Sequence, residues 1–305
     1  MATETTTKPP KIDMYQKVTD RIISHLEAGT PPWRCTWSRY GMPRNYASMN
    51  VYKGINALLL ALAPFPIPYF LTMKQANDLG GKVKKGTKAE QIMYFNFVYK
   101  DKDGNNLTYE EAKKQEFKDI KVLKYLKYYN VFNVDNIEGI DFTFPEITLR
   151  ENESIERCDT LLNSLKNMPE FVQTEGSRCF YVPSRDVINV VPMSQFESSE
   201  SYYNTAFHEL IHGTGHESRL ARPGIVESDG FGKKKYSEEE LVAEIGASFL
   251  AGITGIDRAS LMENNVAYIQ GWLGVLKEDK RFIFRAAAEA QKAVNFMLQD
   301  MPDFA

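Results

Sequence analysis

The chain is poor in cysteine, and the few cysteines it has are scattered. Cys35, Cys158 and Cys179 are the three in 305 residues, and no two of them form a Cys-x-x-Cys pair. This spacing argues against a structural zinc ribbon. Sparse, odd-numbered cysteine is typical of a protein in a reducing cytosol, where each thiol is either packed or reactive.

Long hydrophobic runs are also lacking. The longest apolar stretch, residues 57–70, is interrupted by three prolines, so no membrane span is expected. Residues 1–10 are polar, and no apolar segment of a signal peptide follows them. We therefore expect a cytoplasmic protein that begins with a disordered tail over residues 1–10.

The near-neutral net charge of −3 conceals two halves of opposite sign. Residues 1–130 carry 21 Lys and Arg against 12 Asp and Glu, a net charge of +9. Residues 131–305 carry 16 against 28, a net charge of −12. Such asymmetry predicts a basic N-terminal module that faces a polyanion and an acidic C-terminal module with another task.

Histidine is scarce but concentrated. Of four histidines, three lie within nine residues, and His208-Glu209-x-x-His212 is a metal-site motif. The i, i+4 spacing places both imidazoles on one helix face, and Glu209 would stand beside the water that the metal activates. A chance match would be a solvated polar helix face, but apolar residues at helical spacing surround the motif and Gly213 follows it.

A third metal ligand has three candidates: Glu240, Glu244 and His216. Glu240 lies 28 residues after His212, and Glu240-x-x-Ala-Glu244 resembles the glutamate helix of gluzincin peptidases, which implies Glu240 as ligand and Glu244 as support for a ligand histidine. Ser237-x-x-Glu240 is also a capping-box pattern, and in that case Glu244 would be the ligand. The ligand set suits one divalent ion, Zn²⁺ first, with Mn²⁺ or Co²⁺ as alternatives.

Residues 187–191 are mostly β-branched and predict a strand upstream of the metal helix. It is either an edge strand that holds a peptide substrate or an ordinary core strand. Further strands are expected at 91–99 and 128–134. Periodicity predicts helices at 15–28, 58–62, 72–79, 158–167, 237–247, 268–277 and 279–298.

The basic half also combines cations with aromatic residues on turn-rich segments, a combination that binds single-stranded nucleic acid by stacking and phosphate contacts. A small tryptophan-closed core and a solvated lysine turn are the alternatives. The sequence shows neither a recognition helix nor a zinc finger, so single-stranded nucleic acid is favoured over a duplex. The candidate contact residues are Trp33, Arg34, Trp37, Arg39, Tyr40, Arg44, Asn45, Tyr52, Lys53, Lys82, Lys84, Lys85 and Lys88.

Two sets of motifs, in this order, resemble the ArdC-type antirestriction proteins over nearly the whole chain. The N-terminal domain of that family is similar to residues 15–23, 29–33, 52–56, 74–86 and 128–133, and its zincin-like metallopeptidase domain is similar to residues 208–220 and 239–247. One departure is Gly213, where the family pattern leads us to expect a bulky aromatic side chain, so that the following loop would be looser.

The resemblance implies an α+β protein of two domains, carried by a plasmid or other mobile element, that protects incoming DNA from restriction. We expect a tail at 1–10, a single-stranded-DNA-binding domain at 11–135, a linker at 136–152 and a zincin-like (gluzincin-type) domain at 153–305. The substrate of the peptidase would be a host restriction enzyme or another DNA-bound protein. The rival hypotheses are a non-catalytic DNA-binding protector with a structural metal, and a protease for proteins crosslinked to DNA.

Overall fold

The structure, a computed structural model, falls into two compact units. One unit is Pro43–Phe144, and the other combines Met1–Met42 with Pro145–Ala305. Within the described residues, no helix is long and apolar enough to cross a membrane. The described residues are 13–28, 41–63, 65–144, 151–173, 179–196, 198–227, 234–256 and 266–304.

The unit of residues 43–144 is built on a five-stranded sheet with the strand order β1-β2-β6-β4-β5 and a separate β3-β7 pair. Its short strands are β1 (Arg44–Asn45), β2 (Tyr69–Leu71), β3 (Lys82–Val83), β5 (Asn106–Leu107) and β7 (Ile137–Glu138), and its long strands are β4 (Glu90–Lys100) and β6 (Lys121–Asn133). The helices are α2 (Ile55–Ala61), α3 (Met73–Asp78), α4 (Tyr109–Lys114) and the short 3-10 turn Val134–Asn136.

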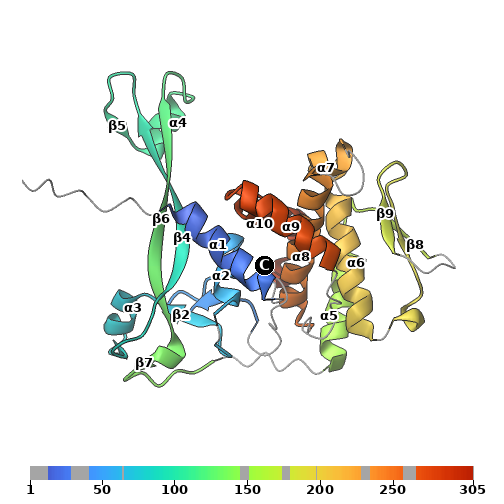
Figure 1. The fold of residues 1–305 in the computed structure, drawn as a ribbon, viewed down its shortest axis with the longest axis horizontal. Helices are drawn as coiled ribbons and strands as arrows, with labels where there is room; N and C mark the ends of the chain where they lie inside the picture. Colours follow the sequence, from blue (N-terminus) through green and yellow to red (C-terminus); the bar gives the residue numbers. More distant parts are fainter. Residues whose placement is uncertain are drawn as a thin grey trace, which may run out of the picture. The chain divides into compact units, whose positions relative to one another are not determined.

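Its core lies at one end of the long strands. Leu60 of α2 packs with Phe70 of β2 and Val131 of β6, and a neighbouring cluster joins Leu71 to Phe132. Beyond this core, β4 and β6 continue as an antiparallel two-stranded ribbon that reaches β5 and α4 (Figure 1). The hydrophobic core therefore anchors only the base of the ribbon.

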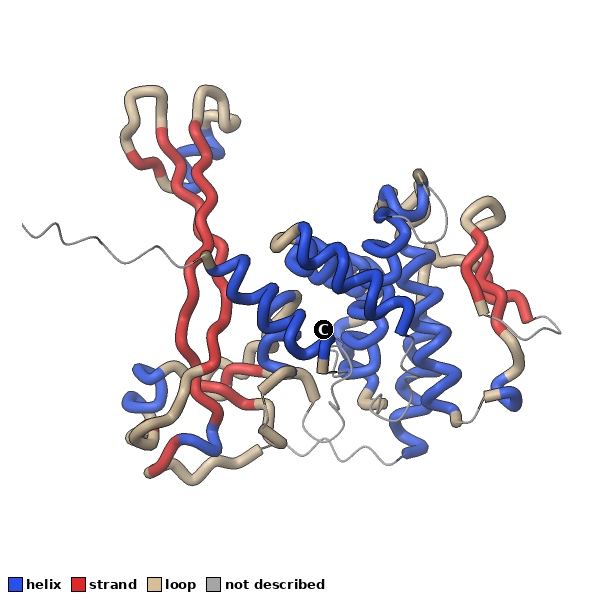
Figure 2. The backbone as a smooth tube through the Cα atoms, in the orientation of Figure 1, coloured by secondary structure: helices blue, strands red, loops and turns tan. Residues whose placement is uncertain are grey.

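The other unit is mainly helical, with a small sheet of order β8-β10-β9. Figure 2 shows its packed helices and this separate group of strands. The helices are α1 (Met14–Glu27), α5 (Glu151–Ser164), α6 (Ser199–Thr214), α7 (Pro223–Val226), α8 (Lys234–Thr254), α9 (Val266–Glu278) and α10 (Phe282–Leu298), with 3-10 turns at Met193–Gln195 and Pro302–Phe304. The strands are β8 (Glu170–Gln173), β9 (Phe180–Val182) and β10 (Val187–Val190).

Helix α1 belongs to this second unit although it stands at the start of the sequence. Its buried stripe Val18, Ile22 and Leu26 repeats every four residues, as one face of a helix does. The Thr19 hydroxyl donates to the Lys280 carbonyl at 2.8 Å, which joins α1 to the segment before α10. The compact units therefore divide the chain differently from the sequence ranges 11–135 and 153–305, which stay a prediction of domain bounds.

Most expected elements form where periodicity placed them, including the strands over 91–99 and 128–134. The charged stretch over 109–127 had no expected structure, and it forms α4 and the first half of β6. Thr108 caps α4 through a capping box with Glu111, a local signal that the hydrophobic pattern does not show. The expected linker 136–152 includes β7 and the start of α5.

Candidate metal centre

Helix α6 carries the His-Glu-x-x-His motif on a well-anchored framework. Phe207, Leu210 and Ile211 are fully buried, so the helix cannot rotate about its axis without exposing them. With that face fixed, His208 and His212 lie one turn apart, and their Nε2 atoms are 3.1 Å from each other.

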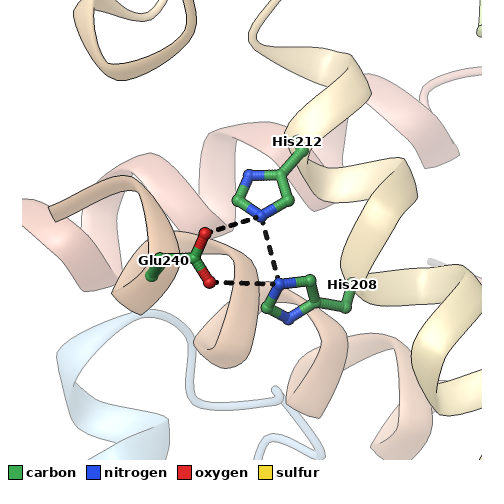
Figure 3. Close-up of side chains that lie close together, drawn as sticks. All are labelled: His208, His212 and Glu240. Carbon is green, nitrogen blue, oxygen red and sulfur yellow. Dashed lines mark hydrogen bonds and ion pairs between the residues drawn. The ribbon is translucent and has the colours of Figure 1, made fainter. Parts of the chain in front are cut away.

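Helix α8 brings a carboxylate to the two imidazoles. Glu240 Oε2 lies 3.5 Å from His208 Nε2, and Glu240 Oε1 lies 3.5 Å from His212 Nε2 (Figure 3). Two donors about 2.05 Å from one tetrahedral ion lie about 3.3 Å apart, so these separations fit a single metal ion. Among the described residues, His208, His212 and Glu240 form the group of histidine, cysteine and acidic side chains that could hold one.

Glu240 is held by α8 in a way that removes the capping-box alternative. Helix α8 begins at Lys234, so Ser237 lies inside it and does not cap it. Glu240 is only 8% exposed. Burial opposes its negative charge, but the two histidines outweigh burial and lower the pKa of Glu240. The side chain is thus an ionised donor that points at the histidine pair.

Each histidine has a carboxylate on its far side. Glu244 Oε1 lies 3.4 Å from His208 Nδ1, and Glu239 Oε1 lies 3.2 Å from His212 Nδ1. Carboxylates in these positions hold the Nδ1 proton and turn the Nε2 lone pairs toward the centre. Burial lowers the pKa of His208, yet Glu240 and Glu244 raise it well above its usual value. The cluster therefore favours a cation at its centre.

Glu239 is a site residue that the sequence analysis missed. Its carboxylate accepts hydrogen bonds from Arg222 at 2.9 and 2.6 Å, and both side chains are buried. Arg222 also donates to the carbonyl of Ile211 and to the hydroxyl of Thr214, both at 2.6 Å. The pair joins α8 to the last turn of α6. No signal in the sequence marks it, because residues 222 and 239 meet only in the folded chain.

Glu209 lies in a pocket of about 360 Å³ beside the three donors. It is 8% exposed, and its Oε2 accepts a hydrogen bond from the Tyr181 backbone N–H at 2.8 Å. No described residue bonds to Oε1. The pocket is lined by Cys179, Phe180, Tyr181, Pro183, His208, Glu209, His212, Gly224, Ile225, Tyr236, Glu239 and Glu240.

The structure does not bring His216 into the group of donors. Its Nδ1 accepts a hydrogen bond from the Ser218 N–H at 3.2 Å and lies 2.8 Å from the Ser218 hydroxyl. Backbone N–H groups of Arg219 and Ala221 donate to its carbonyl. His216 therefore organises the turn after α6.

Gly213 has a packing reason that the sequence could not show. A Cβ atom at this position would stand 2.5 Å from Pro169 Cγ, closer than side chains pack. The residue lies inside α6, which ends only at Thr214. The missing side chain makes room for Pro169 in the chain before β8, while the expected loosening of the loop that leads to His216 stays a prediction.

The strand expected at 187–191 forms β10, but it is not an edge strand. β10 pairs with β8 on one side and with β9 on the other. Within the described sheet, β9 is the edge strand next to the pocket. Tyr181 of β9 directs its N–H to Glu209, so the edge near the metal donors is β9.

The expected DNA-contact residues are placed unevenly. Asn45 is 8% exposed and bonds to Gln75 and Tyr52, which gives it a structural role. Tyr52 packs against the core of the unit, and the Arg44 guanidinium lies 5.7 Å from the Tyr69 ring centre. The five lysines among the expected contact residues are all exposed: Lys53, Lys82, Lys84, Lys85 and Lys88. Trp33, Arg34, Trp37, Arg39 and Tyr40 lie outside the described residues.

Helices α6 and α8, with the donors His208, His212 and Glu240, indicate a zincin-like domain in the C-terminal half. Residues 157–289 match the model of a zincin-like metallopeptidase domain, and residues 12–132 match the N-terminal domain of the anti-restriction factor ArdC. The expected α+β fold of two domains is confirmed by these matches.

Solved structures extend the match to nearly the whole chain. The metal-free antirestriction ArdC protein from plasmid R388 is 34% identical, with a TM-score of 0.75, and the match covers 95% of this chain and 98% of that one. Its Mn(II)-bound structure is 35% identical, with a TM-score of 0.73, and the match covers 96% and 100%. The chain belongs to the ArdC-type antirestriction family, which confirms the resemblance stated from the motifs.

Curated proteins of similar and of much greater length also match this sequence. A DNA primase TraC from Escherichia coli is 34% identical over 298 residues, which is 94% of this chain and 27% of the primase. An uncharacterised protein y4eC from Sinorhizobium fredii is 29% identical over 313 residues, with 99% and 97% coverage. The chain spans about a quarter of the length of the first relative.

Proposed function

We propose that this chain is an antirestriction protein of a mobile element that binds single-stranded DNA and carries a metal-dependent peptidase site. One observation supports the peptidase site above all. His208, His212 and Glu240 converge from two helices in a pocket where Glu209 stands beside them. A metal that only clamps helices would not need an acidic residue in an adjoining pocket.

The net charge of the N-terminal half and the family of the chain support the binding of single-stranded DNA. Residues 1–130 carry a net charge of +9, and this half matches the N-terminal domain of an anti-restriction factor. The solved relatives are named antirestriction proteins and the longer relatives a DNA primase. The protein would act in the cytoplasm, where conjugating DNA enters as a single strand.

One divalent ion would be held by His208, His212 and Glu240. The plasmid R388 protein has a Mn(II)-bound structure, and two imidazoles with one carboxylate suit zinc as well. When bound, such an ion polarises a carbonyl group and makes water more acidic. Glu239 and Glu244 would hold the two histidines in the correct tautomer.

The chain's own groups supply the proton transfers and hold the peptide. Glu209 would accept a proton from the attacking water on Oε1 and later pass it to the leaving amine, while Oε2 stays on the Tyr181 N–H. The peptide would lie along edge strand β9, as an added strand does. A host restriction enzyme or another DNA-bound protein is the expected substrate.

The Glu209→Gln variant of the full chain tests the peptidase site. Removal of the general base should lower cleavage of labelled casein by about 10²- to 10⁴-fold, because proton transfer contributes that much. Mn²⁺ and Zn²⁺ affinity, measured by calorimetry, should stay within about three-fold, since Glu209 is outside the donor set. The Glu217→Gln variant changes an exposed glutamate after α6 and is the control.

Conjugation into a restricting host separates this proposal from a non-catalytic protector. If plasmid survival falls in Glu209→Gln cells and not in Glu217→Gln cells, proteolysis is part of the protection. Full protection by a Glu209→Gln protein that binds metal normally would show that occupancy of DNA, and not proteolysis, is the mechanism.

A further inference from the structure

Val131 and Ile92 join one face of the β4–β6 ribbon to the core at its base, but neither the core nor the metal site explains the rest of that face. The two strands pair over the whole of β4, from Glu90↔Val131 to Lys100↔Lys121. Figure 1 shows them as a long ribbon that ends at β5 and α4. Directly paired residues of antiparallel strands share a face, so the register assigns every side chain to one of two faces.

One face carries three tyrosines and three lysines, and we call it the tyrosine face. It is formed by Tyr94, Lys100, Lys121, Tyr125, Lys127 and Tyr129. From Tyr129 to Lys121 the face runs eight residues along β6, or about 27 Å at the usual rise of a strand. This length suits an extended ligand that follows the ribbon.

The rings of the tyrosine face are exposed and yet fixed in position. Tyr94, Tyr125 and Tyr129 are 54%, 39% and 49% exposed. The Tyr94 and Tyr129 rings meet edge to face, with centres 6.0 Å apart. Lys127 Nζ lies 5.2 Å from the Tyr125 ring centre, and the Asn96 amide donates to the Tyr125 hydroxyl. Neighbouring side chains thus orient the rings without burying them.

The charge of the ribbon selects the kind of ligand. Strands β4 and β6 together contain four lysines and one acidic residue, Glu90, which lies at the end of the ribbon next to the core. Lysines between exposed aromatic rings bind phosphates while the rings stack on bases. Bases stack on such rings only when they are unpaired, so a single strand fits this face better than a duplex does.

The opposite face also has exposed rings, Phe95 at 42% and Phe97 at 44%, but it differs in charge. It carries one lysine, Lys124, and its outer end is covered where Tyr99 contacts Tyr109 and Phe117. Tyr128 lies on this face and is 46% exposed, nearly as much as Tyr129. The ribbon therefore offers matched residues, adjacent in sequence, on the two faces.

We propose that the tyrosine face of the β4–β6 ribbon is a stacking platform for single-stranded nucleic acid. The platform rests on the proposed function, because that function includes the binding of single-stranded DNA. It adds a binding surface that lies outside both the Trp33 region and the Lys82–Lys88 turn. Bases would stack on Tyr94, Tyr125 and Tyr129, and phosphates would pair with Lys121 and Lys127.

The first test compares Tyr129→Ala with Tyr128→Ala in the full chain, with fluorescent oligothymidylate as the probe. Tyr129→Ala should weaken binding at least about ten-fold, because one base loses its stacking partner. Tyr128→Ala should bind within about two-fold of the unchanged chain. Tyr129→Phe keeps the ring and should bind normally, and thermal melting checks that all variants fold.

The second test uses salt. The Lys121→Met, Lys127→Met double variant should flatten the slope of log K against log salt by about 1.4, because each phosphate contact on a single strand contributes about 0.7. Lys124→Met on the opposite face should leave the slope unchanged.

The outcomes separate the platform from the proposed function. If the unchanged chain binds no oligothymidylate, single-strand binding itself fails, and the platform fails with it. If the chain binds but Tyr129→Ala equals Tyr128→Ala, the platform alone is overturned and the strand binds elsewhere. Preference for a duplex of equal length would also overturn the platform. A selective loss on the tyrosine face, in both affinity and salt slope, supports it.

Discussion

At the scale of single residues, Glu239 orients the metal-site histidine His212 through its Nδ1 atom. It contacts His212 on one side and Arg222 on the other, and all three side chains are nearly inaccessible to solvent. A buried ion pair of this kind adds little to stability when intact, but removal of one partner leaves a charge without compensation. Glu239 is therefore a positioning residue whose removal should also destabilise the fold.

The Glu239→Gln variant should be destabilised, and the effect should depend on pH. Burial raises the pKa of Glu239, but Arg222 outweighs burial and lowers it to about 2 from 4.5. The charged form therefore stabilises the fold above pH 4.5, by about 3 kcal/mol, and this contribution fades as the pH falls toward 2. Urea unfolding of the metal-free chain and of the variant, compared from pH 7 to pH 3, measures the difference.

Glu238 provides the control for that variant. Its carboxylate pairs with Arg285 at the surface, where an ion pair contributes about 0–1 kcal/mol. Glu238→Gln should therefore change stability little at any pH and leave Mn²⁺ affinity intact, while Glu239→Gln should weaken that affinity about 10- to 100-fold. Equal behaviour of the two variants would contradict the positioning role.

At the scale of elements, the metal donors depend on how closely α6 and α8 approach. Gly246 of α8 faces Ile211 of α6, and a Cβ atom there would meet three Ile211 side-chain atoms at 2.7 to 3.1 Å, the nearest being Cδ1. Ile211 precedes His212, and Glu240 lies on the same helix as Gly246. The absence of a side chain at Gly246 thus sets the distance across which the donors meet.

The Gly246→Val variant should push the two helices apart. The expected loss of stability is about 1–3 kcal/mol, as for overpacked cores, together with weaker Mn²⁺ binding. Gly274→Ala in α9 is the control, because nothing lies within 4 Å of its added Cβ, and alanine should stabilise that helix by up to about 1 kcal/mol. Thermal melting and calorimetry measure both, and unchanged Mn²⁺ affinity in Gly246→Val would refute the spacing argument.

At the scale of the whole molecule, the unit with the metal donors is assembled from both ends of the chain. Tyr15 of α1 packs edge to face on Phe284 of α10, with ring centres 4.8 Å apart. Lys277 of α9 pairs with Glu27 at 2.8 Å. Residues 43–144 are thus inserted between two segments of one compact unit.

The Ile22→Ala variant tests this arrangement. Ile22 is fully buried, so its truncation should cost about 2–5 kcal/mol and speed hydrogen exchange in α9 and α10. Exchange in β4 and β6 should not change. Leu60→Ala in α2 should do the reverse, because Leu60 belongs to the core beneath the ribbon. Faster exchange in β6 after Ile22→Ala would place α1 in the other unit.

The sequence by itself determined the features that repeat over short distances. The four-residue spacing of His208 and His212 fixes their common helix face, and the apolar period of α1 marks that helix. Aromatic and β-branched residues mark the strand segments 91–99 and 128–134. The motif order also identified the family. These signals are local, because each depends on the geometry of one helix or one strand.

The tertiary structure decided which distant residues meet. It placed Glu239 on His212, assigned α1 to the unit of the metal donors, and made β9 the edge strand in place of β10. It also left the tyrosine face of the ribbon exposed, although the same pattern of aromatic residues could line a core. Local periodicity sets which side of an element is apolar, but only the packing of separate elements sets what that side contacts.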